Sequence, residues 1–167
     1  MTLEVAALEP IQLDVEDNES INPAFKFVKE QFGRLDILVN NAAWNKSWAV
    51  NTAGPHVVSS VFTTLLLKWA DPRLIFIASG TATLLGQTKE DRFTDKAPAK
   101  GCPKEELGWT RVLKEDKVKM CAVSLGLPAT GLGGDQELLR QMGGIDPRIG
   151  AELVRSVIEG EMMRIWA

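Results

Sequence analysis

The sequence FGRLDILVNNAA, residues 32–43, contains the apolar run on which the fold assignment depends. Residues 35–40 are apolar except for Asp36 near the start and Asn40 at the end, as expected for a strand buried on both faces of a parallel sheet. Gly33 lies just before this run and can end a preceding helix, because glycine readily adopts the left-handed conformation that follows a helix. The stretch therefore predicts a helix end followed by a buried strand.

Short apolar runs alternate with helix-period segments along the rest of the chain, which indicates an α/β fold with a parallel sheet. The predicted strands are residues 11–15, 35–40, 74–79 and 118–123. The predicted helices, with apolar residues at helical spacing, are residues 20–32, 51–70, 103–115 and 146–159. We expect a single domain that covers residues 1–167.

Composition excludes several kinds of partner. The net charge is −3 and no basic stripe occurs, whereas nucleic-acid binding needs clustered lysine and arginine. No apolar run approaches the ~20 residues that span a bilayer, and the first nine residues lack a secretion-signal pattern. Cys102 and Cys121 do not have the spacing of a metal site or a disulfide framework. We expect a cytoplasmic protein without a metal, which binds neither nucleic acid nor membranes.

Several motifs, in the same order, resemble the short-chain dehydrogenase/reductase family. The sequence LDV at residues 13–15 is similar to the end of that family's third strand, and NNAA at residues 40–43 to its Asn-Asn-Ala-Gly motif. The likeness continues through residues 50–55, 75–80 and 118–126. This resemblance implies an α/β fold: a truncated, Rossmann-like, doubly wound parallel sheet flanked by helices.

The resemblance also implies roles for individual residues. Asn51 would be the family's active-site asparagine, which organises a proton-relay water, and Ser79 would hydrogen-bond the substrate carbonyl. Ligands of open α/β sheets bind at the carboxyl ends of the strands, where the predicted strands place Ser79. The other implied contacts are Asp14 at the adenine, Asn40 beside the ligand, and Gly126 and Thr130 at the nicotinamide carboxamide.

Three departures from the family predict the loss of ordinary nicotinamide chemistry, and hence no cofactor. The chain begins just before the third strand, without the Gly-rich turn that holds the pyrophosphate. GLGG at residues 131–134 is an alternative phosphate cradle, but Gln136 stands where its last glycine belongs. Residues 41–50 form a shorter loop than the family's. The family's Tyr-x-x-x-Lys, whose tyrosine is the acid/base, is best matched by Lys96 and Lys100, and the chain contains no tyrosine.

Two parts of the predicted site have alternative interpretations. Trp44 and Trp48, in the shortened loop, can cover a core edge or form a flat wall for a ring-shaped ligand. Lys100 can be a catalytic group or a solvent-exposed loop lysine. The candidate catalytic residues are Ser79, Asn51 and Lys100. The candidate substrate-binding residues are Trp44, Trp48, Asn40, Gly126 and Thr130.

Three functions are compatible with these features. The first is a cofactor-independent isomerase, lyase or cyclase for a carbonyl-containing organic molecule such as a secondary-metabolite intermediate. It is preferred because polar site groups survive while the phosphate site does not. The others are an NAD(P)H-dependent reductase with atypical cofactor binding, and a scaffold without catalysis. The apolar helix at residues 51–70 predicts a homodimer. The predicted strand at residues 11–15 needs a neighbour for its backbone groups, so it must pair beside residues 35–40 or with another chain.

Overall fold

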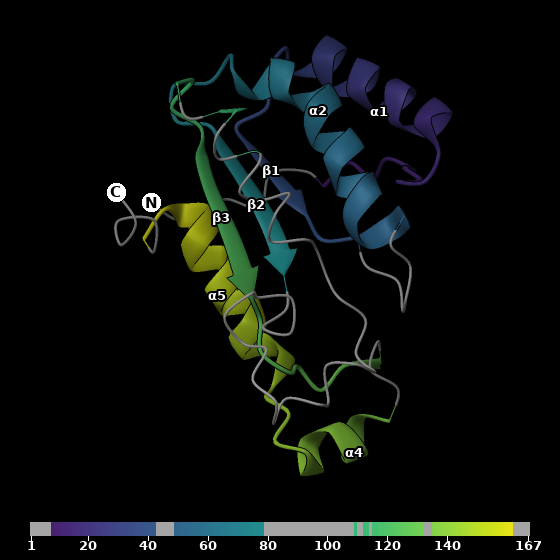
Figure 1. Cartoon of the computed structure of the whole chain (residues 1–167), viewed down its shortest axis with the longest axis vertical. Helices are drawn as coiled ribbons and strands as arrows, with labels where there is room; N and C mark the ends of the chain where they lie inside the picture. Colours follow the sequence, from purple (N-terminus) through teal and green to yellow (C-terminus); the bar gives the residue numbers. More distant parts are fainter. Residues whose placement is uncertain are drawn as a thin grey trace.

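A three-stranded parallel sheet lies at the centre of the computed structural model (Figure 1). The structure describes residues 8–42, 49–78, 109, 112–113, 115–131 and 135–161. The strands lie in the order β1 (Ile37–Asn40), β2 (Arg73–Ala78) and β3 (Lys119–Ser124). Asn40 is in register with Phe76 and Phe76 with Ala122, so β2 and β3 each extend two residues beyond the end of β1.

Helices cover both faces of this sheet (Figure 1). Helices α1 (Asn18–Gln31) and α2 (Gly54–Leu66) pack on one face, and α5 (Pro147–Glu159) packs on the other. A short helix, α4 (Gln136–Gln141), lies beyond the end of the sheet. The prediction of an α/β fold with a parallel sheet between helices is confirmed. No helix within the described residues is long and apolar enough to cross a bilayer.

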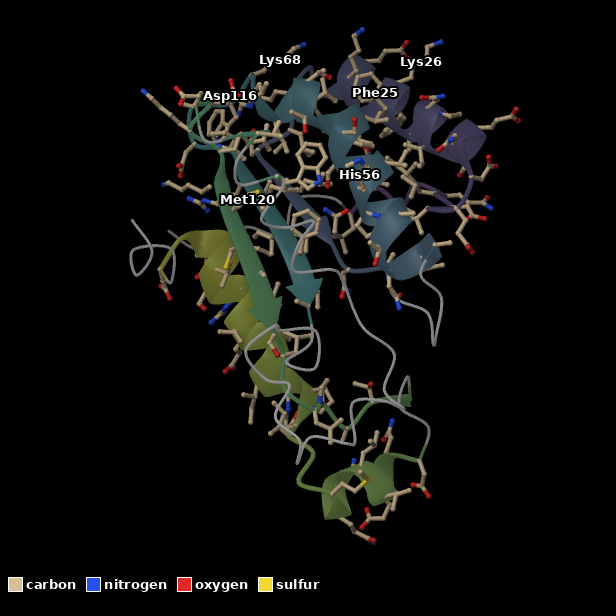
Figure 2. All side chains as sticks on the ribbon, viewed as in Figure 1. Phe25, Lys26, His56, Lys68, Asp116 and Met120 are labelled. Atoms are coloured by element: carbon tan, nitrogen blue, oxygen red, sulfur yellow. The ribbon has the colours of Figure 1, made fainter. Side chains whose placement is uncertain are left out.

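Alternation along each strand sends side chains to the two helical layers. Ile37 and Val39 of β1 pack with the cluster that includes α5, whereas Leu38 packs with α1 and α2. Leu74 and Ile75 of β2 are both fully buried, because the central strand has helices on both faces. Phe25 of α1 (Figure 2) packs edge-on against Phe62 of α2. Their ring centroids are 5.6 Å apart.

Residues 11–15, predicted as a strand, do not form one, and that prediction is wrong. Local hydrogen bonds use backbone groups that a strand ladder would need. The Asp14 N–H donates to Ser20 Oγ at 2.8 Å, and the Glu16 N–H donates to Asp14 Oδ1 at 2.9 Å. Leu13 and Val15 pack on the α1–α2 cluster instead. Within the described residues, β1 is therefore an edge strand.

The predicted helix at residues 51–70 begins and ends differently. A π-helical turn, η1 (Ala49–Ala53), leads into α2, which ends at Leu66. The predicted helix at residues 103–115 lies mostly outside the described residues, although Trp109 and Val112 are helical. Helix α4 was not predicted, because six residues carry too little periodicity to identify a helix.

Asp146 caps the start of α5 and provides a pH-dependent contribution to stability. Hydrogen bonds from the Arg148 side chain and backbone N–H lower the Asp146 pKa to about 2. Because the pKa of unfolded aspartate is about 3.9, this contribution is present above pH ~4 and is lost as the pH falls towards ~2. We expect the Asp146→Asn variant to lose less stability than the parent between these pH values in thermal unfolding experiments. Parallel curves for the two proteins would contradict this assignment.

Candidate functional site

The carboxyl ends of the three parallel strands meet at one edge of the sheet, where ligands of α/β proteins bind. β1 ends at Asn40, β2 at Ala78 and β3 at Ser124. The turn η1 lies at the start of α2, which packs against β1. Of the sequence-predicted site residues, the structure places Asn40, Asn51, Gly126 and Thr130 in the segments that begin or end at this edge.

A hollow of about 570 Å³ opens beside the end of β1. One wall is the non-strand segment at residues 12–16, and the other is formed by Ala42 and Val50. Leu13, Val15 and Val50 are the half-buried apolar residues of these walls, whereas Asp14 and Glu16 are exposed at the rim. The lining of the hollow therefore combines apolar side chains with two carboxylates.

Gly54 allows this wall to approach helix α2. A Cβ atom at position 54 would lie 2.9 Å from Val15 Cβ and 3.0 Å from the Val15 carbonyl oxygen. These distances are shorter than ordinary contacts, and the carbonyl is backbone, which cannot rotate away. The absence of a side chain at Gly54 therefore allows Val15 to pack directly against the start of α2.

Gly54→Ala should destabilise the protein even though alanine is the better helix former. The added methyl group has no space between α2 and Val15, and overpacking of this kind costs about 1–3 kcal/mol. The free energy of unfolding, measured by urea titration, should fall by that amount. The matched control is Gly131→Ala, because no atom lies within 4 Å of that Cβ position. Equal stability of the two variants would contradict the close approach.

Asn51 lies within the π-helical turn and is 5% exposed. Such turns are rare in proteins, and those that do occur are often found at functional sites. The neighbouring Thr52 is also buried, so this turn places two polar residues in the interior of the protein. The sequence predicted Asn51 as a site residue, but it did not predict the π-helical turn.

Asn40 and Ser59 form a buried polar contact that the sequence analysis missed. The Asn40 Nδ2 donates a hydrogen bond to Ser59 Oγ at 3.0 Å. Ser59 is fully buried on α2 and Asn40 is 9% exposed. A signal was present in the sequence, since Ser59 is a polar residue between Val58 and Phe62 on the apolar stripe of the helix.

Gly126 and Thr130 lie in the loop that follows β3. Gly126 has a φ of +71°, a left-handed conformation that favours glycine, and it turns the chain away from the strand. The loop is fixed by a bridge between Pro128 and Ile145, with Ala129 N–H donating to the Ile145 carbonyl at 3.0 Å. This pairing holds Gly126 and Thr130 at the carboxyl end of β3.

The remaining predicted site residues, Ser79, Lys100, Trp44 and Trp48, lie outside the described residues. Ser79 directly follows Ala78, the last residue of β2. Among the described residues, no group of three or more His, Cys, Asp or Glu side chains is placed to hold a metal ion.

Comparisons with known proteins identify relatives for nearly the whole chain. A family model described as "Enoyl-(Acyl carrier protein) reductase" matches residues 2–64. The short-chain dehydrogenase/reductase TropE of Talaromyces stipitatus is 36% identical over 191 aligned residues, covering 93% of this chain and 71% of the relative. The short-chain dehydrogenase/reductase EupG of a Phoma species is 34% identical, covering 92% and 70%.

Solved structures show the same fold at lower identity. A short-chain dehydrogenase from Streptomyces avermitilis matches with a TM-score of 0.68 at 19% identity, covering 93% of this chain and 68% of that one. An alcohol dehydrogenase from the archaeon Thermococcus sibiricus, complexed with 5-hydroxy-NADP, matches with a TM-score of 0.66 at 20% identity, covering 88% and 66%.

The alignment with TropE also shows an internal difference. Its 191 positions exceed the 167 residues of this chain, so the relative contains residues within the matched span that this chain lacks. The sequence predicts such a shortening at residues 41–50. With this identity and coverage, the chain belongs to the short-chain dehydrogenase/reductase family.

Proposed function

We propose that this protein acts on a carbonyl-containing small molecule without hydride transfer, as an isomerase, lyase or cyclase. The observation that carries the proposal is the absence of tyrosine from the sequence, because the family's reaction uses a tyrosine phenol as its acid/base. The positions that best match that motif are Lys96 and Lys100. A lysine ammonium has a reference pKa close to that of a phenol, about 10.4 against about 10, but it is a cation that becomes neutral when it loses its proton, whereas a phenol is neutral and becomes an anion.

The remaining polar groups suit a reaction that begins by polarising a carbonyl. Ser79 and Asn51 would donate hydrogen bonds to the carbonyl oxygen, which stabilises the negative charge that develops there. Loss of electron density to that oxygen acidifies the neighbouring C–H bond, a step common to isomerisation, elimination and cyclisation. The positive charge of Lys100 would further stabilise the negative charge on that oxygen. The proposed substrate contacts are Trp44, Trp48, Asn40, Gly126 and Thr130.

A second candidate, an NAD(P)H-dependent reductase, is favoured by the hollow beside β1. Its volume of about 570 Å³ lies within the range of small-molecule pockets, and Asp14 at its rim is the residue that the family resemblance assigns to adenine. The described residues thus fit the adenosine half of the cofactor. The Asp14 carboxylate would accept a hydrogen bond from the adenine amine, and Val15 and Val50 would pack on its ring. The cofactor, when bound, would supply a hydride.

Titration with NADPH and NADH distinguishes these two candidates. The described residues would contact only the adenosine half, and the sequence contains no tyrosine whose phenol could support the nicotinamide end. We therefore expect dissociation constants weaker than about 100 µM, since few contacts give little binding free energy. Quenching of tryptophan fluorescence would measure the constants, with N-acetyltryptophanamide as the control for NADPH absorbance. A low-micromolar constant that weakens in Asp14→Ala would favour the reductase.

We further propose a cytoplasmic homodimer that associates through the outer face of α2. Most of the helix's apolar stripe is used inside the protomer, where Val58, Phe62, Leu65 and Leu66 are buried. The exposed side includes Leu67, just beyond the end of the helix, with 43% exposure. If the protein instead acts as a scaffold, it would bind a partner and show no turnover.

A further inference from the structure

Arg73 joins the start of β2 to the end of helix α5. Alternation along β2 sends Arg73 to the same face as Ile75 and Ile77, which pack with α5. Its Nη1 donates a hydrogen bond to the Ile158 carbonyl in the last turn of α5. The last four carbonyls of a helix have no partner within it, and the positive guanidinium is favourable at this negative end of the helix dipole.

The other side of the guanidinium is held by Asp71. Arg73 Nη2 lies 2.7 Å from Asp71 Oδ2, and Lys119 Nζ lies 2.5 Å from Asp71 Oδ1. Gly160, just beyond α5, leaves room for the guanidinium, since a Cβ atom there would lie 3.0 Å from Arg73 Nη2. Two directed contacts therefore fix the guanidinium between the sheet and the end of the helix.

This arrangement constrains position more than it adds stability. The Arg73 side chain is 16% exposed, and its Nε is buried without a hydrogen-bond partner in the part of the chain that the structure describes. Replacement of a buried ionic group by an apolar one of similar size is often neutral for stability. Packed helices can slide by small amounts, and a hydrogen bond to one carbonyl selects one position along the axis. The residues that α5 packs against the sheet are aliphatic: Leu153, Val154, Val157 and Ile158.

The opposite end of α5 is joined to the loop at the carboxyl edge of the sheet (Figure 1). The helix spans 13 residues, or about 20 Å. Just before it, the Ile145 N–H donates to the Leu127 carbonyl at 2.9 Å. In its first turns, Gly150 packs on Leu125, whose Cβ lies 3.5 Å from the Cβ position of the glycine. A shift of the helix along its axis would therefore move this loop.

We propose that Arg73 is a positioning residue that sets the place of α5 along the sheet and, through the helix, the place of the loop at residues 125–131. That loop carries Gly126 and Thr130, two of the proposed substrate contacts. Their contact with a ligand rests on the proposed function, whereas the coupling between Arg73 and the loop does not. Loss of the Arg73 contacts should change the distant loop and leave the fold intact.

The coupling can be measured without a ligand, from backbone amide NMR signals and their exchange with solvent. Arg73→Met substitutes an unbranched apolar side chain and leaves Asp71 paired with Lys119. Its thermal unfolding midpoint should stay within a few degrees of the parent's. The amides of Ala129 and Ile145, which are hydrogen-bonded across the loop, should shift and exchange about 3- to 10-fold faster, the range for one hydrogen bond.

Two controls separate this coupling from general loosening. Arg155→Met removes an exposed arginine from the same helix and should leave the loop signals unchanged. The amide of Ile75, which is 0% exposed in the central strand, should keep its protection in Arg73→Met. Unchanged signals of Ala129 and Ile145 in Arg73→Met, or an equal loss of protection at Ile75, would overturn the proposal. If Arg73→Met does not fold, Arg73→Lys keeps the charge without the forked geometry, and the same comparison of amides decides.

Discussion

Leu66→Glu should prevent the chain from folding. Leu66 is 0% exposed and belongs to a core cluster between α2 and the sheet that includes Leu74 and Phe76. The substitution removes about 1.5–3 kcal/mol of apolar burial and places a carboxylate without a partner in the core, which costs several kcal/mol more. Together these costs are comparable to the whole stability of about 5–15 kcal/mol expected for a domain. Circular dichroism should show no cooperative thermal transition.

The same substitution at the next residue is the matched control. Leu67 is 43% exposed, and a surface change of this kind usually alters stability by less than about 0.5 kcal/mol. Leu67→Glu should therefore fold, and it also tests the proposed homodimer. Light scattering should show a dimer for the parent and a monomer for this variant. A Leu66→Glu protein that folds would contradict the burial of this face of α2 against the sheet. A parent protein that is monomeric at high concentration would exclude the dimer.

The strands of this fold could be predicted from the sequence because burial on both faces leaves a strong signal. The runs at residues 35–40, 74–79 and 118–123 agree with β1, β2 and β3 to within two residues at each end. The start of α5 was also encoded locally, since Asp146 caps the helix and Pro147 occupies its first turn. These signals need no knowledge of distant contacts.

Residues 11–15 show the limit of the same reasoning. Ile11, Leu13 and Val15 alternate with polar residues, which is the pattern of a half-buried strand. A strand also requires a neighbour for its backbone groups, and a sequence pattern does not show whether that neighbour is in place. In the structure, Ser20 and the Asp14 side chain bond these backbone groups instead.

The candidate site was predictable where it depends on strand ends and not where it depends on packing. The family resemblance named Asn40 and Gly126, and the structure places Asn40 at the carboxyl end of β1 and Gly126 two residues beyond the end of β3, the edge at which ligands of parallel sheets bind. The contact between Asn40 and Ser59 spans 19 positions in the sequence and depends on the rotation of α2 against the sheet. The hollow beside β1 depends on the approach of Val15 to Gly54, which no local pattern encodes.

Ser79→Ala should lower turnover of a carbonyl substrate by about 10- to 1,000-fold, the range for the loss of one oxyanion-type hydrogen-bond donor. β2 ends at Ala78, at the sheet edge where ligands of α/β proteins bind, and Ser79 is the next residue in the sequence. Asn51→Ala should reduce turnover as well, because the buried amide in η1 is proposed to act on the same oxygen. Deuterium incorporation next to the carbonyl of aromatic ketones, followed by NMR in D₂O, measures the polarisation step without a cofactor.

The two variants together separate an enzyme from a scaffold. Both should retain the parent's thermal unfolding midpoint to within a few degrees, because the expected cost of either change is about 1 kcal/mol, and Ser60→Ala on the exposed face of α2 should retain full turnover. If Ser79 and Asn51 act on one oxygen, the double variant should lose less than the product of the two single losses, since residues that act as a unit are not additive. Equal rates in the parent and both single variants would mean that this polar pair has no present catalytic role. A parent without deuterium incorporation for any ketone would instead support the scaffold.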